Sequence, residues 1–173
     1  MPKTRVFADT NVILEAFRTG SWTAICQQYA IETVEKCIEE ALTGDPTDPG
    51  RIHVDQQALI SGLAQRHSVG KKELANLVLA HPHCQGLDDG ELHLLAWLHN
   101  QGILPNALIL VSTADKAAIV ATNRLGWIDS LVSLEQLAQK SGLTRGQIDS
   151  LAKHYRAGWL DEIKVKVRLG IIP

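Results

Sequence analysis

The side chains best suited to chemistry in this sequence are carboxylates that stand where a predicted strand ends or on a predicted helix. Gathered in one place, such groups repel each other unless a cation offsets them, and Mg²⁺ or Mn²⁺ would do so because these ions take oxygen ligands. An ion of this kind can turn water into a nucleophile and stabilise the oxygen that leaves a phosphodiester. The residues concerned are Asp9, Glu39, Glu40, Glu91 and Asp115.

Each of these acids also has a structural interpretation. Asp9 and Asp115 could each cap the helix that follows. Asp88 and Glu91 have the spacing of a capping box, and the two adjacent glutamates could lie on a solvated helix face. Because the acids fall together near predicted strand ends and helices, four independent structural roles are the less attractive interpretation.

The elements that must position these acids alternate between strand and helix, which predicts an α/β fold with a parallel sheet covered on both faces. Ligands bind outside the carboxyl ends of the strands in such sheets. With the first and third predicted strands near the centre, Asp9 and Asp115 would share one edge. The strands are expected at Thr4–Ala8, Tyr29–Val34, Ala107–Ser112 and Trp127–Val132.

The segments between the strands have helical periodicity or the composition of loops. Gly44–Gly50 is predicted to be a loop and His81–Gly86 an irregular stretch. We assign residues 1–140 to one domain and residues 141–173 to a C-terminal helical extension packed on it. Helices are expected at Asn11–Thr19, Ser21–Gln28, from Val34 to Leu42, Asp55–His67, Lys71–Leu79, Asp89–Asn100, Lys116–Leu125, and from Ser133 to about Leu160 with a break at Gly142.

Three of the acids lie in segments that together resemble the PIN-domain family. Phe7–Leu14 resembles the family's opening, an apolar strand that runs into Asp-Thr-Asn-Val. Leu87–Leu92 resembles its Leu-Asp-x-Gly-Glu motif, and Val111–Lys116 resembles its strand followed by Thr-x-Asp. Ile128–Leu137 resembles the last strand and its trailing helix, so the resemblance extends from Thr4 to Leu137. It implies a three-layer α/β/α sandwich and a ribonuclease-type endonuclease that uses Mg²⁺ or Mn²⁺.

The resemblance also assigns roles to individual residues. Asp9, Glu91 and Asp115 take positions that hold a metal ion or activate water. The family places a further glutamate between apolar neighbours on the helix after the second strand; Glu40 fits this position better than Glu39, and both stay candidates. The polar residues that accompany the acids are Asn11, Thr113, Asp88 and Ser112.

The expected reaction is the hydrolysis of phosphodiester bonds in single-stranded or loop RNA. Many PIN proteins are toxins of toxin–antitoxin pairs, so the resemblance also implies an antitoxin protein and a homodimer as partners. This chain departs from the compact toxin pattern in the Gly44–Gly50 loop and in its helical tail, and the toxin role is therefore one option among several. The alternatives are a non-catalytic PIN scaffold that binds nucleic acid or regulates, and a PIN-like nuclease that acts on DNA.

Positive charge is concentrated locally, because the formal net charge of the chain is -2. A polyanion would therefore bind to a local basic patch or through metal ions. The main concentration contains Tyr155 and lies near Trp159, and it could grip a single-stranded backbone and stack a base. A solvated helix face is the favoured alternative, because acidic residues lie among the basic ones. The nucleic-acid-binding candidates are Lys116, Arg124, Lys153 and Arg156.

Two further motifs favour structural roles. Leu137–Ile148 resembles a helix-turn-helix, but two capped helices joined by a glycine explain it better. His81–Cys84 could contribute to a zinc site, yet no second cluster stands at the required spacing, so a polar loop is the better interpretation. Three cysteines without a C-x-x-C pair predict reduced, packed thiols in a cytoplasmic protein. No apolar run predicts a signal peptide or a membrane partner.

Overall fold

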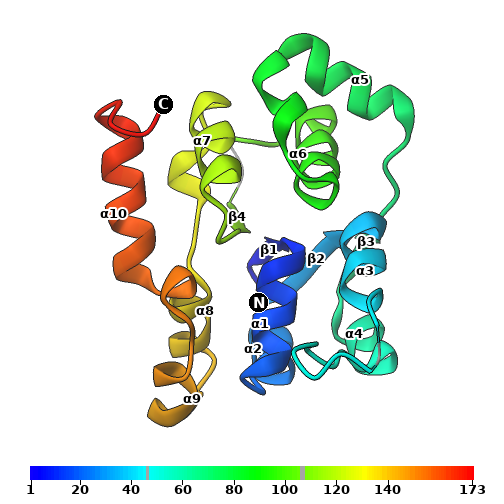
Figure 1. Cartoon of the computed structure of the whole chain (residues 1–173), viewed down its shortest axis with the longest axis vertical. Helices are drawn as coiled ribbons and strands as arrows, with labels where there is room; N and C mark the ends of the chain where they lie inside the picture. The colour runs from blue at the N-terminus through cyan, green and yellow to red at the C-terminus, as the bar shows by residue number, and fades with distance from the viewer. Residues whose placement is uncertain (46, 106–107) are drawn as a thin grey trace.

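The computed structural model describes residues 1–45, 47–105 and 108–173. Within these residues the centre is a parallel sheet with the strand order β3-β2-β1-β4, and helices cover both of its faces (Figure 1). The predicted α/β/α architecture with a central parallel sheet is therefore confirmed. Pro46 of the predicted loop and Ala107 of the predicted strand lie outside the described residues. The strands are β1 Arg5–Ala8, β2 Ala30–Val34, β3 Gln65–His67 and β4 Ile109–Ser112.

The helices agree with most of the predicted boundaries to within two residues. None of those in the described ranges combines the length and hydrophobicity needed to cross a bilayer. The longer elements are α1 Thr10–Arg18, α2 Trp22–Gln28, α3 Glu35–Leu42, α4 Gln56–Gly62, α5 Lys71–Ala80, α6 Asp89–Gln101, α7 Lys116–Arg124, α8 Leu134–Lys140, α9 Arg145–Asp149 and α10 Ala157–Arg168. Short 3₁₀ turns are η1 Pro82–Gly86, η2 Ile128–Ser130 and η3 Lys153–Tyr155.

The direction of the strand order reverses between β1 and β4. The chain moves one way from β1 to β2 and β3, and then returns past the whole sheet through α5 and α6 to reach β4. Because such crossovers are right-handed, α5 and α6 lie on the opposite face from α1, α2 and α4 (Figure 1). The carboxyl ends of β1 and β4 meet at this reversal, which is where open α/β sheets bind ligands.

Apolar packing fixes β1 in the middle of the fold. Val6 and Phe7 are fully buried, and the ring of Phe7 stacks on Trp97 of α6 with centroids 5.2 Å apart. Val12 and Ile13 bury the inner face of α1, which begins directly after β1. Full burial of a side chain of this size contributes about 2 kcal/mol, so the position at which β1 ends is firmly set.

The predicted helix Asp55–His67 is wrong in its second half. The helix ends at Gly62, where a Cβ atom would come within 2.6 Å of the Trp22 indole nitrogen. Beyond it the chain runs beside β2, Ala64 N donates to Ile31 O at 2.8 Å, and β3 follows. The polar strand β3 lacks an apolar alternation because it lies at the edge of the sheet; only His67 turns inward, onto Trp97.

The predicted strand Trp127–Val132 is also wrong. The segment forms η2, closed by the turn hydrogen bonds Ser130 N to Trp127 O and Leu131 N to Ile128 O. Its contact with the sheet is one isolated bridge between Val111 and Leu131. As a result β4 is an edge strand beside β1, whereas both β1 and β4 were expected near the centre; the two interior strands are β1 and β2.

The segment predicted to be helical from Ser133 to about Leu160 consists of α8, α9, η3 and the start of α10. Both helices begin with a capping box: the Ser133 hydroxyl accepts from Gln136 N, and the Thr144 hydroxyl accepts from Gln147 N. Two capped helices joined by a glycine therefore stand where the sequence resembles a helix-turn-helix. The following α10 lies along one side of the molecule beside α7 and α8 (Figure 1).

An ion pair on α1 joins the residues beyond 140 to the rest of the fold. The carboxylate of Glu15 is almost completely buried and accepts hydrogen bonds from Arg18 and, at 2.7 Å, from Ala152 N. Arg18 also donates to Ser150 O at 2.7 Å. On the other side, Glu135 accepts from Ala157 N at 2.6 Å. These contacts hold the segment that contains η3 from both ends.

Candidate active site

Asp9 stands at the end of β1 and is 1% exposed. Its Oδ1 accepts from Thr10 N at 2.6 Å and caps α1, while Oδ2 accepts from the Thr113 hydroxyl at 3.1 Å. The pKa of Asp9 is raised to about 6, mainly by burial and also by the charges of Glu40 and Asp115, against the lowering effect of these hydrogen bonds. Asp9 therefore does cap α1, but the cap hydrogen bond does not offset the cost of burying its negative charge.

Glu91 lies in the first turn of α6 and is 5% exposed. Its Oε1 has no hydrogen-bond partner among the described residues. Burial is the main cause that raises the pKa of Glu91 to about 8, and the charges of Asp9, Asp115 and Asp88 add to it. The Asp88 side chain makes no cap hydrogen bond to α6, so the capping box predicted for this pair is not formed.

Asp115 is the third acid at this edge of the sheet. Its Oδ1 accepts from Ala118 N at 3.0 Å and caps α7. Asp115 N donates to the Thr113 hydroxyl at 3.3 Å, and that hydroxyl donates to Asp9, so Asp115 lies next to Asp9; its charge also raises the pKa of Asp9 and Glu91. The structure thus brings together acids that are up to 106 positions apart in the sequence.

Glu40 and Glu39 point to different places. Glu40 accepts from the Thr10 hydroxyl at 2.7 Å and from Gly90 N at 3.0 Å, and it lines the acidic hollow. A Cβ atom on Gly90 would lie 2.3 Å from the Glu40 carboxylate, so this approach requires glycine. Glu39 is exposed and pairs with Lys36 at 3.3 Å; the same ammonium group lies 3.7 Å from Asp89, but Glu39 itself does not line the hollow. The structure therefore places only Glu40 of this pair at the candidate site.

Asp9, Glu40 and Glu91 line a hollow of about 410 Å³, which Asp115 does not line. Asp9 and Glu91 also line a smaller cavity, together with mostly apolar side chains of α6, β4 and α7. These low-dielectric surroundings are the physical reason that both carboxyl groups are hard to ionise. The residues that line the hollow are Asp9, Thr10, Asn11, Glu40, Leu87, Asp88, Asp89 and Glu91.

The donors at this edge suit a hard divalent cation, because they are carboxylate and hydroxyl oxygens and one buried carboxylate oxygen lacks a partner. In the described ranges, no three His, Cys, Asp or Glu side chains are arranged to hold a metal ion as they stand. Asp9, Glu91 and Asp115 would be the residues to hold one, with Glu40 at the rim.

The predicted supporting residues lie around this edge in different ways. Asn11 is exposed at the mouth of the hollow, and Thr113 binds Asp9 directly. Ser112 is fully buried; its carbonyl accepts from Asp9 N, while its hydroxyl has no partner in the described structure. Asp88 lies on the rim.

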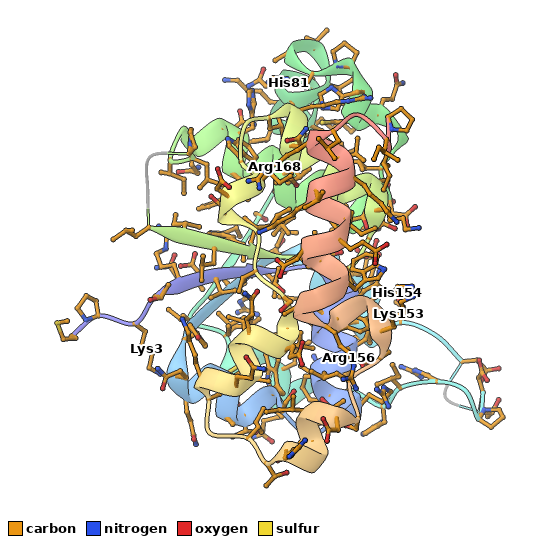
Figure 2. All side chains as sticks on the ribbon, turned by 90° about the vertical axis from the view of Figure 1, so that its left-hand side faces the viewer. Lys3, His81, Lys153, His154, Arg156 and Arg168 are labelled. Carbon is orange, nitrogen blue, oxygen red and sulfur yellow. The ribbon has the colours of Figure 1, made fainter. Side chains whose placement is uncertain are left out.

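The basic candidates divide between two places. Lys116 and Arg124 of α7 line a second hollow of about 400 Å³, which shares Leu87 with the acidic hollow. Lys153 and Arg156 lie near the N-terminal end of α10 (Figure 2). The Arg156 guanidinium donates to two backbone carbonyls of the extension, so its role in the described structure is to hold that segment.

Several residues that shape the site were not singled out from the sequence. Thr10 could have been found, since it lies inside the Asp-Thr-Asn motif and binds Glu40. Cys37, whose sulfur lies 3.5 Å from Gly90 O, carried no signal beyond being apolar. Glu15 and Arg18 have the spacing of an ordinary helix ion pair, and nothing local reveals that they also bind Ala152 N and Ser150 O, more than 130 residues away.

Comparison with known proteins adds no relative. A scan against protein-family models found no model that matches the chain, and searches among curated proteins and solved structures found no significant match.

Proposed function

We propose that this protein is a metal-dependent endoribonuclease that uses Mg²⁺ or Mn²⁺. One observation carries the proposal: Asp9 and Glu91 are buried together at the sheet reversal, with raised pKa values and no cation of the protein among their hydrogen-bond partners. Folding such a site costs free energy, and a divalent ion is the simplest partner that repays it. The resemblance of the motifs to the PIN family, stated above, agrees with this chemistry.

Each side chain would have a defined task. Asp9, Glu91 and Asp115 would hold the ion, which supplies positive charge and an activated water at the phosphodiester. Thr113 and Thr10 N fix the orientation of the Asp9 carboxylate. Glu40, held by Thr10 and Gly90, would orient water at the rim, and Asn11 at the mouth could bind a phosphate oxygen.

The substitution Asp9→Asn is expected to abolish cleavage, with a loss of about 1,000-fold or more, because one metal-binding charge is removed while Thr10 N keeps an oxygen to bind. Cleavage of a single-stranded RNA and of a DNA of the same sequence is measured with Mn²⁺. Glu40→Gln should also lose activity, and the neighbouring Glu39→Gln is the matched control that should not.

The same preparations give a readout without turnover. Mn²⁺ should raise the melting temperature of the wild-type protein, EDTA should reverse the rise, and Asp9→Asn should show little response. An Asp9→Asn protein that still cleaves RNA would overturn the assignment. A wild-type protein without any response to Mn²⁺ would favour a non-catalytic scaffold.

A further inference from the structure

A separate hollow of about 390 Å³ opens beside the acids, and the C-terminal extension forms one of its walls. Asn11 lines both this hollow and the acidic hollow, so the two adjoin. Asp115, a proposed metal ligand, lies on the shared side. The residues that line the hollow are Asn11, Ala114, Asp115 and Lys116 from the sandwich, and His154, Tyr155 and Trp159 from the extension.

The extension supplies rings to this hollow. The rings of His154 and Trp159 meet edge to face with centroids 5.1 Å apart. Trp159 is buried and His154 is exposed, so the indole supports an imidazole whose other surface is open. Half-buried Tyr155 lies between them in sequence. Flat side chains held in this way present the surface on which a nucleobase stacks.

Positive charge gathers next to the rings. Glu162 on α10 has a lowered pKa, first because Lys166 binds it and also because Lys153 and Lys116 lie near it. Lys116 lines the hollow at the start of α7, and Lys153 directly precedes His154 in η3, the 3₁₀ turn that contributes to the opposite wall. Lys153 and His154 lie together near the N-terminal end of α10, apart from Lys3 and His81 (Figure 2). A phosphate on either side of a bound base would meet one of these lysines.

The wall is held firmly in relation to the acids. The Glu15 carboxylate binds Ala152 N immediately before η3, and Glu135 binds Ala157 N immediately after Arg156. Glu15 belongs to α1, the helix that Asp9 caps. One short helix therefore sets the distance from the acids to the rings, as a subsite for an adjacent nucleotide requires.

We propose that this hollow is a base-binding subsite, in which a nucleotide next to the scissile phosphate stacks its base on His154 while Lys116 and Lys153 bind the flanking phosphates. The inference rests on the proposed function, since its occupant is part of the polymer that the acids would cut. A base in a duplex is already stacked and paired, so the subsite selects single-stranded RNA.

Binding is tested with a fluorescent single-stranded 12-nucleotide RNA of mixed sequence in Ca²⁺, a condition intended to limit turnover. His154→Ala should raise Kd about tenfold, because stacking on a ring is lost. His154→Phe should stay within about threefold of the wild type, since it keeps a ring. His53→Ala, an exposed histidine in the loop before α4, is the matched control and should bind as the wild type does. Equal Kd values for His154→Ala and the wild type would overturn the proposal.

The substrate can be changed as well as the protein. In a series of RNAs, each of which lacks the base at one position, one RNA should bind the wild type about tenfold less tightly than the complete RNA. His154→Ala should bind that RNA and the complete RNA equally well. A duplex of the same sequence that binds as tightly as the single strand would also refute the subsite.

Cleavage measurements separate this proposal from the nuclease proposal. His154→Ala should raise KM more than it lowers kcat, whereas Asp9→Asn should abolish kcat. If the wild type binds RNA through His154 but cuts neither RNA nor DNA with Mn²⁺, the subsite stands and the proposed nuclease function fails. If the wild type cuts RNA and His154→Ala has an unchanged KM, the nuclease function stands and the subsite proposal fails.

Discussion

Two pairs of buried carboxylates in this protein are compensated in opposite ways. Glu15 and Glu32 are 3% and 2% exposed, and each binds an arginine through both carboxylate oxygens. Asp9 and Glu91 are equally buried, but their neighbours are hydroxyl groups, backbone N–H groups and further acids. Arginines of the protein neutralise Glu15 and Glu32. Asp9 and Glu91 have no arginine or lysine among their partners in the described residues, so each is either an uncompensated anion or protonated.

The pKa values follow from this difference. Burial by itself would raise the pKa of Glu32, but hydrogen bonds from Arg5 and His67 outweigh it and lower the value. Burial is likewise offset at Glu15 by Arg18 and by Ala152 N. At Asp9 and Glu91 burial prevails, and the pKa rises. Under the proposed function this contrast has a purpose: the two acids at the strand reversal lack an arginine because an external cation would bind there.

The largest effect on stability is expected when a cation is removed from a neutralised acid. Arg18→Ala leaves the Glu15 carboxylate with Ala152 N as its remaining partner, and should lower the free energy of unfolding by about 3 kcal/mol. Urea unfolding at pH 7 measures it. The matched control is Arg145→Ala, which breaks an exposed pair with Asp149 and should change stability by less than about 0.5 kcal/mol. Equal effects of the two changes would end the comparison.

The second effect has the opposite sign. Glu91→Gln removes a charge that the metal-free fold does not compensate, and should raise the free energy of unfolding by about 2 kcal/mol at pH 8 in EDTA. The pKa of Glu91 is about 8 in the folded protein and near 4.5 when exposed. The folded protein therefore holds the proton more tightly, and the metal-free wild type should lose stability as the pH rises from about 5 to 8.

Denaturation across this pH range, with and without Mn²⁺, tests the sign. The fall in stability between pH 5 and pH 8 should be smaller in Glu91→Gln than in the metal-free wild type. It should be smaller again in the wild type when Mn²⁺ is bound. The lowered pKa values of Glu15 and Glu32 act the other way, since their stabilisation is present at neutral pH and is lost as the pH falls through their folded-state values. A metal-free protein that gains stability between pH 6 and pH 8 would contradict the account of Asp9 and Glu91.

The positions of Asp9 and Asp115 at strand ends could be predicted from the sequence, whereas the long-range contacts that neutralise Glu15 could not. Asp9 and Asp115 were found because each follows a strand whose apolar run is a local signal. Glu15 looks like an ordinary polar residue of an amphipathic helix, and its partner Ala152 lies 137 positions away. The strand β3 was missed for a related reason: its one inward side chain packs on a tryptophan of another helix, which no local pattern records.

The choice between Glu39 and Glu40 on α3 shows where a prediction from neighbouring residues stops. Glu39 and Glu40 differ by about 100° around α3, and apolar neighbours favoured Glu40 without excluding Glu39. Which of them lines the hollow depends on Gly90, whose missing side chain allows α6 to approach Glu40. Gly90 belongs to the motif that resembles the family's Leu-Asp-x-Gly-Glu, but its contact with Glu40 became visible only in the folded chain.

The smallest effect is expected where a neutral donor serves a buried charge. Thr113→Val keeps the shape of the side chain but removes the hydroxyl that donates to Asp9 Oδ2, and should lower the free energy of unfolding at pH 8 by about 1 kcal/mol. Thr113→Ser keeps the hydroxyl and is the control. A neutral hydroxyl stabilises the buried charge of Asp9 only in part. The loss in the free energy of unfolding should therefore be clearly smaller than that caused by Arg18→Ala. A loss as large as that of Arg18→Ala would mean that Thr113 neutralises Asp9 as fully as an arginine does, and that no external cation is needed there.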